Sequence, residues 1–233
     1  MEYLRARLLG ETAHISLNTE RGVTIAEIVY KKGETTVGGV TFNDFGEPVG
    51  ASTYPVDAGE YEAYVTLKGY GKQETVMIPY VVNPRTIAAE DIVIIGLKQW
   101  YEENKTYEVS YGSRFDVPLV ATYEVAEGAE GTLENGIPAG LGKYKVTIRV
   151  VSMNYVGEAV AYLEVVEVCT VTFMNGSVTE SSITVEKGKA VKSPPRAAGE
   201  GFVCWCEDSG LETPFDFTEN ITTNLTLYAK FQS

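Results

Sequence analysis

An internal repeat constrains the fold of this chain more than any other feature of its sequence. The segment 54–61 (YPVDAGEY) matches 137–144 (IPAGLGKY), with Pro, Gly and Tyr at the same three places and a constant offset of 83 residues (55 and 138, 59 and 142, 61 and 144). After the Tyr of each copy, apolar and polar residues alternate through 61–68 and 144–150. Because successive side chains of a strand point to opposite faces, both runs predict half-buried β-strands.

Each copy continues with a second predicted strand, at 75–82 and at 159–166. Segments that contain Gly and Tyr, at 69–72 and 153–157, separate the paired strands and indicate hairpin turns. A period of this length with several short strands per unit is typical of tandem β-sandwich domains. We therefore predict an all-β protein.

Two positions mark the predicted domain boundaries. Pro84 has no N–H to donate to a ladder and restricts the conformation of Asn83, so we place the first boundary there. The second falls near Glu167, where composition and pattern change. The predicted domains are 1–84, 85–167 and 168–233. Neither connection is long or rich in Gly and Ser, so we expect the domains to follow one another end to end with limited swing.

The charge of the chain argues against two classes of partner. Its 32 acidic and 19 basic residues give a formal net charge of −13. Such a surface repels phosphate backbones and anionic lipid surfaces, so we expect no nucleic-acid partner. The longest apolar runs, such as 92–95, are far too short to span a bilayer, and no apolar signal-peptide core is visible near the first residues. We expect no membrane insertion within this chain.

The repeated unit resembles the bacterial immunoglobulin-like repeats of the MBG type. It shares with them the Pro-x-x-x-Gly-x-Tyr turn, the alternating strand after it, the Tyr-containing hairpin and a final Val-rich strand. The resemblance is best over 86–167 and weaker over 1–84. Repeats of this family occur in tandem in large surface and secreted proteins, so the resemblance implies two immunoglobulin-like β-sandwiches in an exported bacterial protein.

The C-terminal segment 168–232 resembles the Listeria–Bacteroides repeat, also called the internalin B-repeat, a small β-grasp-like module. The matching residues are spread through the whole segment: VTF at 171–173, VEKGKA at 185–190, FVCW at 202–205, TPFDF at 213–217 and ITTNLTLYAK at 221–230. The residues expected in the core of the module are Phe173, Phe202, Trp205, Phe217 and Leu227. The resemblance implies a third β domain and a location at the bacterial cell surface.

This segment departs from the family at Cys204 and Cys206, where the family has Gly and Tyr beside its core tryptophan. In a strand the two cysteines point to one face and Trp205 to the other. Alternate residues lie about 6.5–7 Å apart at the backbone, so a direct disulfide between them would be strained. A zinc site needs about four ligands, whereas the chain has three Cys and a single His in another domain. We favour packing thiols, and leave open a disulfide from Cys169 to Cys204 or Cys206.

Motifs for catalysis or for a bound cofactor are absent from the sequence. His14, the only histidine, lies in an alternating run and is interpreted as an ordinary strand residue. Acidic pairs at 90–91, 102–103 and 207–208 lack the spaced oxygen ligands of a calcium loop, and we interpret them as solvated. Donors for an internal Lys–Asn isopeptide crosslink are available at Lys31, Lys32 and Lys105. We predict no enzyme activity, no cofactor and no metal site.

Aromatic residues of the middle domain are the candidate ligand-facing feature. They are Trp100, Tyr101, Tyr107 and Tyr111. One exposed row of all four would favour a carbohydrate-binding module, because aromatic faces stack on sugars, while burial of all four would count against it. The interpretation that we prefer is that they fill the core and edges of a sandwich.

These observations predict a non-enzymatic structural or adhesive segment of an extracellular bacterial cell-surface protein, acting as a stalk or interaction module. The alternative is a carbohydrate-binding or host-glycan-binding module of a secreted or surface protein. The partner in either case is a protein or glycan on a host or cell surface. The extracellular location rests on the two family resemblances.

Overall fold

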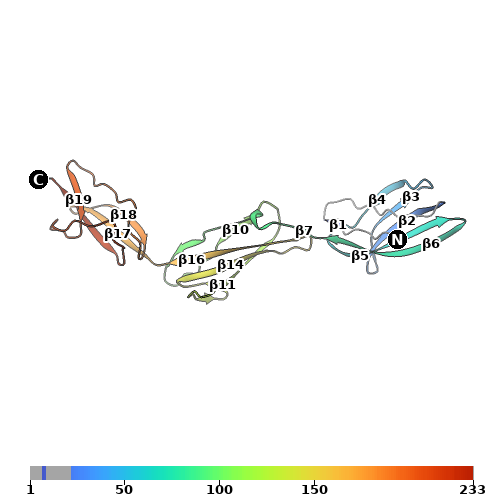
Figure 1. Ribbon diagram of the computed structural model, residues 1–233, viewed down its shortest axis with the longest axis horizontal. Helices are drawn as coiled ribbons and strands as arrows, with labels where there is room; N and C mark the ends of the chain where they lie inside the picture. The colour runs from blue at the N-terminus through green and yellow to red at the C-terminus, as the bar shows by residue number, and fades with distance from the viewer. Residues whose placement is uncertain (1–6, 9–21, 233) are drawn as a thin grey trace. The chain divides into compact units, whose positions relative to one another are not determined.

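The computed structural model describes residues 7–8 and 22–232 (Figure 1). Within these residues regular structure consists of β-strands apart from one 3₁₀ turn, η1 (Ala89–Asp91), so the prediction of an all-β protein is confirmed. Residue contacts divide the chain into two units, one from 1–93, 112–121 and 148–159 and the other from 94–111, 122–147 and 160–233. The boundaries proposed at Pro84 and Glu167 stay predictions.

A six-stranded sheet forms the first part of the chain. Its strands are β1 (Arg7–Leu8), β2 (Val23–Lys32), β3 (Thr35–Phe42), β4 (Pro48–Thr53), β5 (Gly59–Gly69) and β6 (Lys72–Asn83). Their order is β1-β6-β5-β2-β3-β4, antiparallel except that β1 runs parallel to β6. The β5–β6 hairpin closes where Gly69 pairs with Lys72, as the turn at 69–72 predicts. One face carries the buried side chains Ile28, Tyr30, Val40, Tyr61, Ala63, Val65, Tyr80 and Val82.

The repeated turn has the same geometry in both copies. Gly59 and Gly142 have φ angles of +153° and +148°, which side chains other than Gly rarely adopt. Two residues later, the hydroxyl groups of Tyr61 and Tyr144 each donate a hydrogen bond to the carbonyl oxygen four residues earlier, at 2.8 and 2.7 Å. A tyrosine hydroxyl that bonds back to upstream backbone fixes the chain as it enters a strand, as in the tyrosine corner of immunoglobulin folds. The sequence repeat is therefore also a repeat of backbone structure.

Residues 85–166 form one four-stranded sheet and several short pairs of strands. The strands are β7 (Arg85–Thr86), β8 (Ile92–Ile95), β9 (Lys98–Trp100), β10 (Ser110–Ser113), β11 (Leu119–Val125), β12 (Leu133–Glu134), β13 (Ile137–Pro138), β14 (Gly142–Val150), β15 (Tyr155–Val156) and β16 (Glu158–Val166). The four-stranded sheet has the order β11-β14-β16-β9, and the pairs are β8–β10, β12–β13 and β7–β15. The inward side chains of β14 and β16 are buried, among them Tyr144, Val146, Ile148, Leu163 and Val165.

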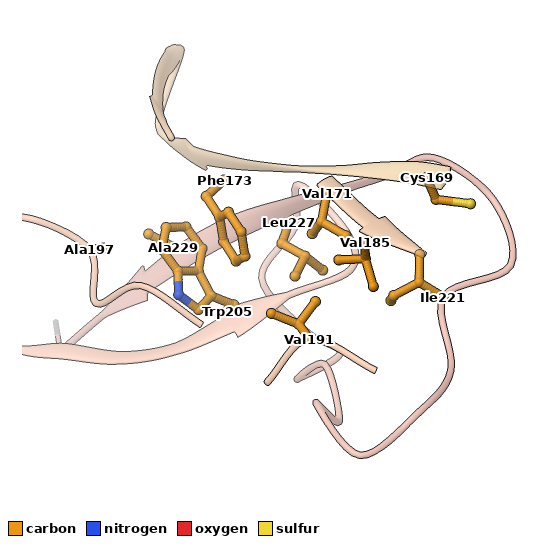
Figure 2. Close-up of a cluster of buried hydrophobic side chains, with 10 residues drawn as sticks. All are labelled: Cys169, Val171, Phe173, Val185, Val191, Ala197, Trp205, Ile221, Leu227 and Ala229. Atoms are coloured by element: carbon orange, nitrogen blue, oxygen red, sulfur yellow. The ribbon is translucent and has the colours of Figure 1, made fainter. Parts of the chain in front are cut away.

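The C-terminal sheet contains β17 (Val168–Asn175), β18 (Val178–Glu186), β19 (Phe202–Cys206) and β20 (Leu225–Phe231). Its order is β18-β17-β20-β19, with the two central strands β17 and β20 parallel and the outer pairs antiparallel. One residue, Glu167, separates β16 from β17. Figure 2 shows the buried cluster of this sheet, which consists of Cys169, Val171, Phe173, Val185, Val191, Ala197, Trp205, Ile221, Leu227 and Ala229.

Candidate functional site

The four candidate ligand-facing aromatics are not equivalent. Tyr107 is fully buried, and its hydroxyl accepts the N–H of Glu102 at 2.6 Å, so its ring is not open to a ligand. Trp100 on β9 and Tyr111 on β10 are 53% and 40% exposed, and Tyr101 is half-buried. Because β9 and β10 belong to different sheets, Trp100 and Tyr111 do not lie in one row.

Trp100 shares the outer face of the four-stranded sheet with a tyrosine that sequence reasoning did not single out, Tyr162 on β16. Val166 pairs with Trp100 in the parallel β16–β9 ladder, and Tyr162 lies four residues before Val166, so all three point to the same face. Tyr162 is 51% exposed. The signal that could have identified it is the alternation in 158–165, in which the even-numbered residues face away from the core.

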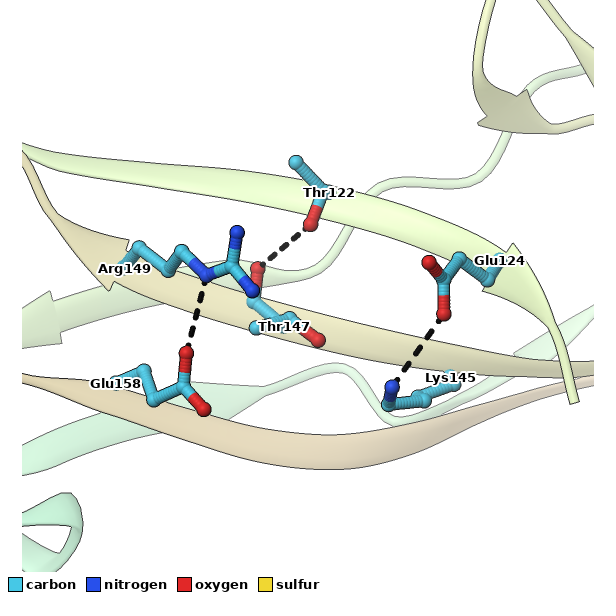
Figure 3. Close-up of polar contacts among 6 residues, drawn as sticks. All are labelled: Thr122, Glu124, Lys145, Thr147, Arg149 and Glu158. Atoms are coloured by element: carbon cyan, nitrogen blue, oxygen red, sulfur yellow. Dashed lines mark hydrogen bonds and ion pairs between the residues drawn. The ribbon is translucent and has the colours of Figure 1, made fainter.

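Cross-strand polar contacts lie on the same outer face (Figure 3), and the ammonium group of Lys143 lies 5.4 Å from the centre of the Tyr162 ring. Lys145 pairs with Glu124 at 3.3 Å and Arg149 with Glu158 at 3.0 Å, each joining neighbouring strands. The hydroxyl of Thr122 donates to the carbonyl oxygen of Thr147 at 3.4 Å. Exposed ion pairs of this kind each stabilise a protein by roughly 0–1 kcal/mol. The arrangement is that of a solvated sheet face with two exposed aromatic rings.

Trp205 is the centre of the C-terminal core. Its ring is 2% exposed and packs edge-on against Phe173, with ring centroids 4.8 Å apart, and against Phe202 at 5.3 Å. Its indole N–H donates to the carbonyl oxygen of Pro195 at 2.7 Å, which satisfies the one polar atom of the side chain. Phe217 stacks on Phe173 at 6.4 Å. Leu227 is fully buried in the same cluster.

All three cysteines are free thiols. Cys169 is buried in the core cluster, at the end far from Trp205 (Figure 2). Cys204 and Cys206 alternate with Trp205 along β19, so they lie on the other face of the sheet, where their sulfur atoms are 3.8 Å apart. The disulfides left open, from Cys169 to Cys204 or to Cys206, would have to join opposite faces across β20.

One member of each acidic pair has a protein partner in the structure. Asp91 forms an ion pair with Arg114, and Glu102 pairs with Lys105 at 2.6 Å. Asp208 accepts the backbone N–H groups of Thr213 and Glu212, and these bonds lower its carboxyl pKa. In the described part of the chain, no group of three or more His, Cys, Asp or Glu residues is placed to hold a metal ion.

The three lysines considered for a crosslink each contact an aromatic ring or a carboxylate. The ammonium group of Lys31 lies 4.7 Å from the ring centre of Tyr64, and that of Lys32 lies 5.5 Å from the ring centre of Tyr61. Lys105 pairs with Glu102. His14 lies outside the described residues.

A hollow of about 460 Å³ lies beside the β5–β6 hairpin. Its lining includes Lys31, Glu60, Glu62, Tyr61 and Met77, and contains no Ser, Thr, Cys or His. The hydroxyl of Tyr61 is already bonded to backbone.

Comparison with known proteins identifies the C-terminal segment. Residues 170–230 match the family model of the Listeria-Bacteroides repeat domain, a family found in bacterial surface proteins. This confirms the resemblance for that segment, while the immunoglobulin-like resemblance of 1–167 stays a prediction. The search for curated relatives finds no protein that matches the chain. In the part of the chain that the structure describes, no helix has the length and apolar character needed to cross a membrane.

Proposed function

We propose that this chain is a non-enzymatic segment of an extracellular bacterial surface protein, in which it serves as a spacer that carries other parts of the protein. The observation that carries the proposal is the match of 170–230 to a repeat family of bacterial surface proteins. The repeated tyrosine turn supports it, because tandem copies of one β unit are the usual construction of such spacers.

Short connections between sheets support a spacer that resists bending. A single residue, Glu167, lies between β16 and β17. The N–H of Lys187 donates to the carbonyl oxygen of Glu167 at 2.9 Å, and the side chains of the same two residues form an ion pair at 2.9 Å. A second ion pair, at 2.5 Å, joins Lys98 on β9 to Glu186 on β18. A connection this short and this well bonded limits swing between the two sheets.

Exposure on intact cells tests the location. Antibodies raised against the purified chain are applied to cells of the bacterium that encodes it, before and after treatment with an external protease. The proposal predicts labelling of unpermeabilised cells that the protease removes. Labelling that appears only after permeabilisation contradicts it.

The second candidate function, glycan binding, is favoured by the exposed rings of Trp100 and Tyr162 on one sheet face. Four residues of strand place them about 13 Å apart along the strand direction, a distance that a short oligosaccharide spans. The test is a screen of the full chain against glycans, mucins and extracellular-matrix proteins. Saturable binding that Trp100→Ala and Tyr162→Ala abolish, and that the control Tyr111→Ala retains, supports a glycan site. A blank from folded protein supports the spacer alone.

A further inference from the structure

Two thiols of the C-terminal repeat are in contact with each other on the face of the sheet opposite Trp205. The sulfur atoms of Cys204 and Cys206 are 3.8 Å apart. Neither residue belongs to the buried cluster around Trp205, whereas Cys169 does. The cluster around Trp205 therefore accounts for Cys169 but does not include the two cysteines of β19.

The two cysteines of the pair differ in burial. Cys206 is completely buried, because the chain after β19 folds back and Cys206 forms an isolated β-bridge with Pro214. Cys204 is only partly buried. Lys230 pairs with Cys204 across the β19–β20 ladder, and its ammonium group donates to the carbonyl oxygen of Leu211 at 2.8 Å.

The separation of the sulfur atoms is that of two thiols in ordinary contact, and it also matches a shared metal ion, whereas a disulfide needs a closer approach. Two thiolates bound to one tetrahedral ion, at about 2.3 Å each, lie about 3.8 Å apart. A disulfide requires the sulfurs to approach to about 2.05 Å, and the backbone spacing of alternate strand residues lies at the upper limit of what a disulfide tolerates. Ion binding thus uses the geometry already present, while oxidation has to distort β19.

The charge state of the pair sets how binding depends on pH. Burial and the contact with the Cys204 sulfur raise the pKa of the Cys206 thiol, with Lys230 acting in the opposite direction and Asp208 in the same direction. Thiols lose their protons when they bind a metal ion, so binding strengthens as the pH rises.

We propose that Cys204 and Cys206 form a two-thiolate site for a soft, thiophilic d¹⁰ cation such as cadmium, which does not amount to the four-ligand site that structural zinc needs. In the binding step each S–H bond breaks, each proton passes to solvent, and two metal–sulfur bonds form without a change of oxidation state. No third His, Cys, Asp or Glu completes the site among the described residues. The remaining coordination positions are open to water or to a small thiol.

Cadmium alone is the probe, because thiolate-to-cadmium charge transfer gives an ultraviolet band that carboxylate binding does not. The full chain, reduced with a phosphine, is titrated with Cd²⁺ and followed by this band and by proton release. The expected result is one Cd²⁺ per chain, a smaller band at pH 6 than at pH 8, and loss of the band in Cys204→Ala and Cys206→Ala. Cys169→Ala is the matched control and retains it.

A measurement on the unmodified chain covers the case in which Cys206→Ala fails to fold. Bound Cd²⁺ is expected to slow alkylation of Cys204, the partly exposed thiol, by at least about tenfold, as read by peptide mass mapping. Cadmium binding without the band, a band that survives Cys204→Ala, or unchanged alkylation of Cys204 overturns the proposal.

Discussion

The hydroxyl of Tyr144 donates a hydrogen bond to the carbonyl oxygen of Gly140 at 2.7 Å. The same hydroxyl accepts the N–H of Thr132 at 3.0 Å. In the other copy of the repeat, Tyr61 bonds to the carbonyl oxygen of Asp57 at 2.8 Å. This four-residue relation explains why Gly and Tyr recur at fixed spacing, since the glycine adopts the positive φ of the turn and the tyrosine hydroxyl bonds back across it.

Removing one hydroxyl tests this explanation. We expect Tyr144→Phe to lower the free energy of unfolding by about 1–3 kcal/mol, because it leaves the Thr132 N–H without its recorded partner. Tyr61→Phe loses the hydrogen bond to the carbonyl oxygen of Asp57 and is expected to lower the free energy of unfolding by less, about 0.5–1.5 kcal/mol. Urea unfolding followed by circular dichroism measures both, with Tyr111→Phe as the exposed control. Equal stability of Tyr144→Phe and the unmodified chain contradicts a structural role for the turn.

The two turn glycines give a matched pair of variants. An added Cβ at Gly142 would lie 2.1 Å from the carbonyl oxygen of Glu130, whereas at Gly59 the nearest atom is the flexible Lys32 ammonium nitrogen at 3.3 Å. Gly59→Ala is expected to cost roughly 1–3 kcal/mol through its backbone conformation alone. Gly142→Ala adds a clash with backbone of roughly 1–3 kcal/mol more. Thermal unfolding of the two variants, side by side, is the measurement, and equal losses would show that the clash is relieved.

Trp205 anchors the C-terminal repeat. Trp205→Phe loses the indole bond to Pro195 and part of the ring, and we expect it to destabilise this segment by about 1–3 kcal/mol. Trp205→Ala leaves a cavity and is expected to cost about 3–5 kcal/mol. Hydrogen exchange read by mass spectrometry locates the loss. Protection should fall in peptides from β17, β19 and β20, while the peptides of β5 and β6 stay unchanged.

Acid should weaken the loops of the same repeat. Backbone N–H bonds from Thr213 and Glu212 hold the pKa of Asp208 below its ordinary value of 3.8, and the backbone N–H and hydroxyl of Thr218 do the same for Asp216. A carboxyl whose pKa is lowered on folding stabilises the fold above its ordinary pKa, and that contribution is lost as the pH falls through the folded value. Stability curves between pH 5 and pH 2 should therefore fall less steeply for Asp208→Asn. A variant curve parallel to that of the unmodified chain argues against the linkage.

Local patterns in the sequence predict much of this fold. The strands predicted at 61–68 and 144–150 correspond to β5 and β14, because apolar and polar residues alternate along them. The strands predicted at 75–82 and 159–166 correspond to β6 and β16, which follow turn-forming residues. The parallel ladders β1–β6, β7–β15 and β9–β16 were not predicted. They join segments that are far apart in the chain, and neither alternation nor turn chemistry specifies a distant partner.

The candidate site is likewise predicted from the sequence only in part. Alternation along 204–206 predicts that the two cysteines face away from Trp205, and the structure has them so. It does not predict that Pro214 returns to cover Cys206, which depends on how the loop after β19 folds. Tyr107 lies among exposed aromatics in the sequence but is buried, because its hydroxyl finds partners in the backbone of Glu102.

Small-angle X-ray scattering of the full chain tests the spacer proposal most directly. A compact globule of this length has a radius of gyration of about 18 Å. A spacer built from β units with short connections predicts a radius of gyration well above that value. We expect the radius to be the same at low and high salt, and the scattering profile to be that of a fully folded chain. A radius of gyration near 18 Å for the monomer would contradict the spacer proposal and favour a binding module.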